Sequence, residues 1–197
     1  KLSKRDGDRL GFPVFPTEWK NPETGDISTG YKESGYISAA FINMLAFLGW
    51  NPGTTQEIFS MEDLIKAFSL ERVGKAGAKF DFDKTKWFNQ QYLRAKSKEE
   101  LAQELKCILK DNGIVAEDNF VATVCEQLKE RATFVKDMWE EGKYYFVAPT
   151  NYDENTIRKK WEEDTSIFLL ELKNRIKEIT HFTAKNIETE FKSYLEE

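Results

Sequence analysis

Apolar side chains recur with the period of an α-helix along most of the chain, and this pattern restricts the fold more than any other feature. Between residues 37 and 48 the apolar positions follow one another at spacings of three and four, and Asn43 is almost the only polar residue among them. Such spacing is typical of a helix that is buried nearly all round, and Gly49 and Pro52 would end it. Comparable stretches follow as far as residue 195. The pattern therefore predicts a mostly α fold.

Polar residues that cap helices divide the middle of the chain. Ser60 followed by Asp63 resembles a capping box and predicts a short helix, and Asp83 predicts the start of the next one. Ser97 with Glu100 forms a complete capping-box pattern ahead of a further helix.

The longest predicted helix carries one apolar stripe from Val121 to Trp139 and ends at Gly142. Tyr144–Val147 then favours a packed aromatic connector rather than a strand. Three more helices are predicted, over residues 157–161, residues 168–179 and from Thr183 onward.

Residues 1–33 are rich in glycine, proline and charge, which predicts a loop with a short hairpin near Gly11–Phe15. The chain begins with Lys1 rather than Met, and we expect it to be part of a longer protein. No apolar run approaches the ~20 residues of a membrane span. Cys107 and Cys125 both fall on predicted apolar stripes, so we expect neither a disulfide framework nor a metal site, and a reducing cytoplasm fits best.

Lys1, Ser3, Lys4 and Arg5 bring ammonium, hydroxyl and guanidinium groups together within five residues. These groups match the oxygens of a polyphosphate. A basic stretch of this length is more often simply solvated, and the motif alone does not decide between the two interpretations.

The continuation of the chain adds a resemblance to a known family. Lys1–Arg5 looks like the second signature of class I aminoacyl-tRNA synthetases. Five further runs resemble bacterial-type glutamyl-tRNA synthetases: Gly30–Tyr36, Asn43–Trp50, Glu57–Ser60, Phe68–Val73 and Phe80–Trp87.

The resemblance implies a division of the chain into four parts. Residues 1–33 would hold the lysine loop and an insertion, and residues 34–96 a stem-contact fold. Residues 97–150 would form an all-helical anticodon-binding subdomain, and residues 151–197 the start of a second one.

The family activates glutamate with ATP and Mg²⁺ to glutamyl-adenylate and then transfers the glutamate to the 3′ end of tRNA(Glu). By resemblance, Lys4 would be the catalytic residue on the leaving phosphates, with Lys1, Ser3 and Arg5 also binding ATP. The resemblance further implies a monomeric, cytoplasmic enzyme that does not bind a membrane. We expect no metal ion to be bound by residues of this chain. We expect the chain by itself to be inactive and to hold no cofactor.

The family also suggests which residues touch tRNA. Arg72, Lys84 and Trp87 lie in the segment that the family uses against the inner side of the tRNA, although Trp87 could equally belong to the core. Arg131, placed in the long predicted helix, matches the arginine that reads the third anticodon base. A guanidinium suits this task because it is always charged and presents a rigid fork of donors.

Several alternatives stay open. Asp81 and Asp83 could be a Mg²⁺ pair, but a turn and helix cap is the commoner role, and His181 at a helix boundary favours a packing or capping role. For the whole chain, the alternatives are an all-α scaffold for protein interactions and a non-discriminating or glutaminyl-type synthetase. Arg131 counts against the last of these.

Overall fold

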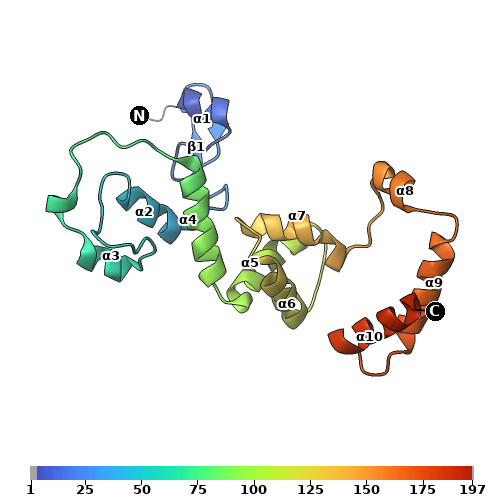
Figure 1. The fold of residues 1–197 in the computed structure, drawn as a ribbon. Helices are drawn as coiled ribbons and strands as arrows, with labels where there is room; N and C mark the ends of the chain where they lie inside the picture. Colours follow the sequence, from blue (N-terminus) through green and yellow to red (C-terminus); the bar gives the residue numbers. More distant parts are fainter. Residues whose placement is uncertain (1–3, 197) are drawn as a thin grey trace. The chain divides into compact units, whose positions relative to one another are not determined.

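The computed structural model describes residues 4–196, and the chain divides into two compact units between Ala148 and Pro149. Helices make up most of both units, which confirms the predicted mostly α fold (Figure 1). The first unit contains α1 to α7, a short 3₁₀ helix and a two-stranded sheet, and the second contains α8 to α10.

The N-terminal segment differs from its prediction. A helix, α1 (Lys4–Leu10), stands where a loop was predicted, and the hairpin lies at β1 (Trp19–Lys20) and β2 (Ile27–Ser28) rather than near Gly11–Phe15. The hairpin turn forms around Gly25, whose φ of 78° favours glycine and whose amide donates to the carbonyl of Asn21.

A small hydrophobic core of Trp50, Phe59 and Leu64 lies beside α2 (Ser38–Ala46) and α3 (Met61–Ala67). Helix α4 (Phe82–Ala95) packs next to it, with the Phe88 ring 5.8 Å from that of Phe47. The Ser60 cap of α3 is confirmed, because the hydroxyl of Ser60 accepts from the Asp63 amide at 3.1 Å. The predicted cap of α4 was two residues too late. Asp81, not Asp83, accepts from the Lys84 amide at 3.0 Å, and the helix therefore begins at Phe82.

Helices α5 (Lys98–Asp111), α6 (Asp118–Leu128) and α7 (Val135–Phe146) enclose the larger core. The capping box of α5 is confirmed, with the Ser97 amide donating to Glu100 at 2.8 Å and the Glu100 amide donating to the Ser97 hydroxyl at 3.2 Å. Cys125 is buried in this core as predicted. The prediction for Cys107 was wrong, because its side chain is exposed.

The single long helix predicted from Val121 to Gly142 is two helices with a connection at residues 129–134. The Asp137 carboxylate makes the break, because it accepts from the amides of Thr133 at 3.0 Å and Phe134 at 2.8 Å and so caps a new helix. Gly142 does not end α7. A Cβ there would lie 2.6 Å from Leu128 Cδ1, so this glycine allows α6 and α7 to approach. The connector predicted over Tyr144–Val147 was therefore wrong, because Tyr144–Phe146 form the last turn of α7.

The second unit consists of α8 (Glu154–Lys160), α9 (Thr165–Glu178) and α10 (Ala184–Leu195). Tyr194 of α10 joins the last two helices, since its ring lies 4.8 Å from that of Phe168 and its hydroxyl donates to Glu171 at 2.7 Å. Helix α10 begins next to Thr183 as predicted, and the Thr183 hydroxyl caps it by accepting from the Asn186 amide. The side chain of His181 is exposed, and its carbonyl accepts from the side chain of Asn186.

Candidate nucleic-acid interface

Two of the predicted RNA-binding residues, Lys84 and Trp87, lie one turn apart on α4. The ammonium of Lys84 lies 3.0 Å from Glu57 Oε1 and 5.5 Å from the centre of the Phe47 ring, with 42 % of its side chain exposed. Trp87 is 37 % exposed and meets Phe88 edge to face at 5.1 Å. Each of the two side chains is therefore half embedded in its surroundings and still presents a surface to solvent.

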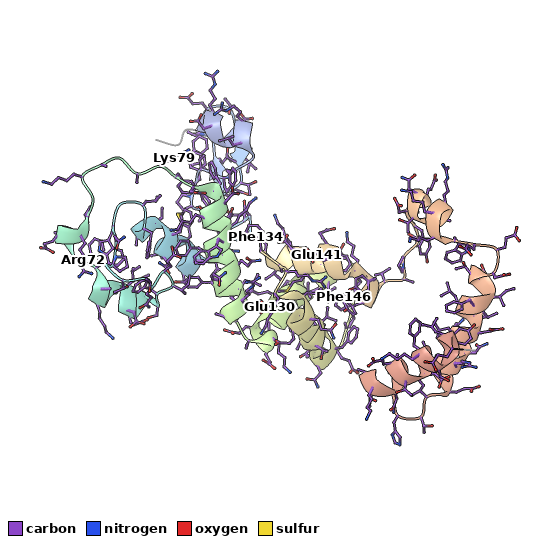
Figure 2. All side chains as sticks on the ribbon, viewed as in Figure 1. Arg72, Lys79, Glu130, Phe134, Glu141 and Phe146 are labelled. Atoms are coloured by element: carbon purple, nitrogen blue, oxygen red, sulfur yellow. The ribbon has the colours of Figure 1, made fainter. Side chains whose placement is uncertain are left out.

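Arg72 lies on a different element, the 3₁₀ helix η1 (Leu70–Arg72), and is exposed. Its guanidinium lies over the turn at Gly53, where an added Cβ would lie 3.1 Å from Arg72 Nη1. The φ of Gly53 is 74°, and the Asn51 side chain accepts from its amide at 2.6 Å. This turn positions the guanidinium at the outer edge of the unit (Figure 2).

A cavity of about 300 Å³ lies between α2 and the loop that leads into α4, and Lys79 and Lys84 both line it. The loop is tied to the end of α2 by the Gly74 amide, which donates to the Gly49 carbonyl at 2.6 Å. Lys79, labelled in Figure 2, is a residue that the sequence reasoning missed. The run of lysines at positions 75, 79, 84 and 86 was the available signal.

Arg131 is exposed and lies in the connection between α6 and α7, not within a long helix as predicted. Two side chains of α4 bind this connection, one near its start and one near its end. Arg94 donates to the carbonyl of Glu130 and its Nε lies 3.3 Å from the Glu130 carboxylate, while Asn89 donates to the carbonyl of Thr133 at 2.6 Å. Figure 2 shows Glu130 and Phe134 at the two ends of this connection. The arginine is thus presented from an anchored turn.

Polar and aromatic groups surround Arg131. The hydroxyl of Tyr145 donates to Gln127 Oε1 at 2.7 Å. A hydrogen bond with Tyr144 raises the pKa of the Tyr145 hydroxyl, and the nearby charge of Arg131 acts in the opposite direction. The sequence analysis did not single out Tyr145, which comes near Arg131 because the chain turns back after α6. Donors, acceptors and aromatic rings together suit contacts with unstacked RNA bases.

The basic motif Lys1–Arg5, for which phosphate binding was predicted, lies only partly within the described residues. Lys1 and Ser3 lie outside the described residues, Lys4 opens α1, and Arg5 follows it with an exposed side chain. Asp81 acts as a helix cap. Within residues 4–196 no three His, Cys, Asp or Glu side chains gather as they would around a metal ion, and no helix there is long and apolar enough to cross a membrane.

Two protein families match the chain. The anticodon binding domain family matches residues 99–197, and the family described as tRNA synthetases class I (E and Q), catalytic domain, matches residues 20–87.

Individual proteins match over the whole chain. The glutamate–tRNA ligases of Porphyromonas gingivalis and Phocaeicola vulgatus are 51 % and 52 % identical over 100 % of this chain and 39 % of their own lengths. A crystal structure of a glutamate tRNA ligase from Elizabethkingia meningosepticum has a TM-score of 0.95 and 45 % identity, again over 100 % of this chain and 39 % of that one. The chain therefore spans about two fifths of the length of these relatives.

Proposed function

The chain belongs to the glutamyl-tRNA synthetase family of class I aminoacyl-tRNA synthetases, and we propose that it supplies the tRNA-binding part of an enzyme that joins glutamate to tRNA(Glu). The reaction proposed for the whole enzyme consumes ATP, forms glutamyl-adenylate and pyrophosphate, and transfers glutamate to the 3′ end of the tRNA. We also propose that the enzyme is monomeric and cytoplasmic, which agrees with its two unpaired cysteines.

The observation that carries the proposal is the position of two candidate RNA-binding surfaces at the two ends of α4. Lys84 and Trp87 lie near its beginning, and Arg94 near its end binds the connection that carries Arg131. Ten residues separate Lys84 from Arg94, which corresponds to about 15 Å along a helix. A helix of this length acts as a spacer between a stem contact and an anticodon contact (Figure 1).

At the first surface, Arg72, Lys79 and Lys84 would neutralise backbone phosphates, and Trp87 would pack against a ribose or a base. Such contacts hold the tRNA in register without reading its sequence. They also make binding depend on salt, because each neutralised phosphate releases counterions.

At the second surface, Arg131 would read the third anticodon base with its guanidinium fork. Cytosine stands there in glutamate anticodons and guanine in glutamine anticodons. On its Watson–Crick edge cytosine presents two neighbouring acceptors, N3 and O2, that match two donors of the arginine fork. The N1–H and N2–H donors on the same edge of guanine would face the fork unfavourably. Gln127 and Tyr145 would complete the polar surface around the base.

The basic segment Lys1–Arg5 would act on ATP. The donor set of Lys1, Ser3, Lys4 and Arg5 consists of cations and a hydroxyl, and it fits the phosphate oxygens of ATP. When bound, ATP with its Mg²⁺ would supply the adenylyl group that activates glutamate, and pyrophosphate would leave. Lys4 would hold the leaving phosphates, with Lys1, Ser3 and Arg5 beside it.

Equilibrium binding tests the proposal. A labelled tRNA(Glu) transcript titrated with the chain should bind at low salt, and the affinity should fall linearly on a log–log plot as salt is added. The alternative function, an all-α scaffold for protein interactions, predicts no binding at any salt concentration. Equal affinity for tRNA(Glu) and tRNA(Gln) would instead favour a non-discriminating synthetase.

A further inference from the structure

A second cavity in the first unit contains two lysines and no carboxylate among its lining residues. It has a volume of about 310 Å³ and lies where the segment after α1, the turn before α2, α4 and the start of α7 meet. Lys86 comes from α4 and Lys136 from α7. The hydroxyl-bearing side chains of Ser34 and Tyr36 line the same cavity.

Aromatic rings in the cavity wall support both ammonium groups. Lys86 Nζ lies 5.5 Å from the centre of the Phe12 ring, and Lys136 Nζ lies 5.1 Å from the centre of the Phe134 ring. The rings are themselves packed, since Phe12 stacks on Phe82 at 3.5 Å and Phe134 meets Tyr36 edge to face at 4.9 Å. Both lysines are exposed, and the cation–π contacts favour positions of their ammonium groups over these rings.

The charge of this cavity is not balanced by the side chains around it. Among the side chains that the structure describes, no carboxylate lies within 4.0 Å of either lysine. Asp137, the neighbour of Lys136, directs its Oδ2 to the amides of Thr133 and Phe134. Two like charges that face one cavity repel each other, and an anion between them would remove that cost.

The hydroxyl groups favour the same kind of ligand. Burial raises the pKa of Tyr36, so its hydroxyl stays protonated at neutral pH and is able to donate. Ser34 already donates to the Gly30 carbonyl at 2.8 Å, which leaves its oxygen as an acceptor. An anion with several oxygens matches two ammonium groups and one hydroxyl donor.

We propose that Lys86 and Lys136 together bind one phosphodiester group of an RNA backbone in this cavity. The proposal rests on the tRNA-binding function proposed above and adds a third contact to it. Lys86 lies two residues after Lys84, and Lys136 lies five residues after Arg131. A phosphate held here would fix the register of the tRNA between the stem contact and the anticodon contact.

The salt dependence of tRNA(Glu) binding tests the proposal quantitatively. The chain is compared with Lys86→Ala, Lys136→Ala and the double variant, and thermal unfolding verifies that all of them fold. Loss of one phosphate contact should lower the slope of log K against log[salt] by about 0.7–0.9. Between about 50 and 200 mM salt, that difference changes the relative affinity about threefold.

The double variant separates a shared site from two independent ones. If both lysines hold the same phosphate, the double variant should lose about as much slope as the single variants do. Twice that loss would mean two separate phosphates and would overturn the proposal. Lys110→Ala, an exposed lysine on α5 outside this cavity, is the matched control and should leave the slope unchanged.

The remaining outcomes are also decisive. If the unchanged chain binds tRNA(Glu) and the slopes of all variants equal its own, the phosphate site is refuted while the proposed function stands. If the unchanged chain binds no tRNA, both fail. If inorganic phosphate, followed by ³¹P NMR, binds the unchanged chain but not the double variant, and the tRNA slopes do not change, the cavity takes a free anion and not an RNA backbone.

Discussion

Replacing Asn89 with alanine should weaken the first unit more than any other polar substitution outside the caps. Asn89 is fully buried, and its side chain uses both ends: Oδ1 accepts from the Ile37 amide at 2.7 Å, and Nδ2 donates to the Thr133 carbonyl at 2.6 Å. Alanine would leave both backbone groups without their partner. Each unsatisfied group costs about 1–3 kcal/mol, so the free energy of unfolding should fall by about 2–6 kcal/mol.

Urea unfolding followed by tryptophan fluorescence measures this change. Asn112→Ala is the matched control, because Asn112 is exposed and its side chain donates only to the Ile108 carbonyl in its own helix. We expect the control to lose less than about 1 kcal/mol. Asn89→Asp keeps the acceptor for Ile37 but loses the donor to Thr133 and buries a charge, so it should lose at least as much as alanine. Equal losses for Asn89→Ala and Asn112→Ala would refute the reasoning.

Three further predictions concern recognition and reactivity. In the longer protein, Arg131→Gln should reduce the preference for charging tRNA(Glu) over tRNA(Gln) by about 1–3 kcal/mol, by analogy with a bidentate base contact. The melting temperature should hardly change. Unchanged selectivity would mean that Arg131 is only a surface residue. The exposed thiol of Cys107 should react rapidly with a colorimetric disulfide reagent, whereas Cys125 should not, because it is buried and burial raises the pKa of the Cys125 thiol to about 11. Cys107→Ser should abolish the rapid phase, and two rapidly reacting thiols would contradict the structure. The chain alone should show no glutamate-dependent pyrophosphate exchange, because electrostatic stabilisation by Lys4 needs an adenylate site facing it, and measurable exchange would disprove this.

Local signals predicted much of the fold. The caps at Ser60, Ser97 and Thr183 act through the next three residues, so the sequence alone is sufficient to locate them. The break after α6 could not be predicted in this way. The apolar stripe continues across residues 129–134, and the turn depends on Asp137 and on contacts from Asn89 and Arg94, which are distant in the sequence.

The candidate site shows the same limit. Lys84 and Arg131 were proposed from their charge and from the family that their segments resemble. The side chains that position them could not be predicted in this way. Glu57 lies 27 residues before Lys84, and Gln127 and Tyr145 meet only when α7 folds back along α6. Residue type and resemblance therefore predict the candidate contact residues, whereas the side chains that position them became known only from the tertiary structure.

A hydroxyl-radical footprint of tRNA(Glu) on the chain tests the central claim most directly, because the claim is that one folded chain contacts both a stem and the anticodon. The account predicts two separate protected stretches, one on the inner side of the stem region and one in the anticodon loop. Arg131→Gln should reduce protection only in the anticodon loop, and the charge-removing variant Lys79→Ala only in the stem region. The absence of protection, or the same protection pattern on an unrelated RNA hairpin, would contradict the account.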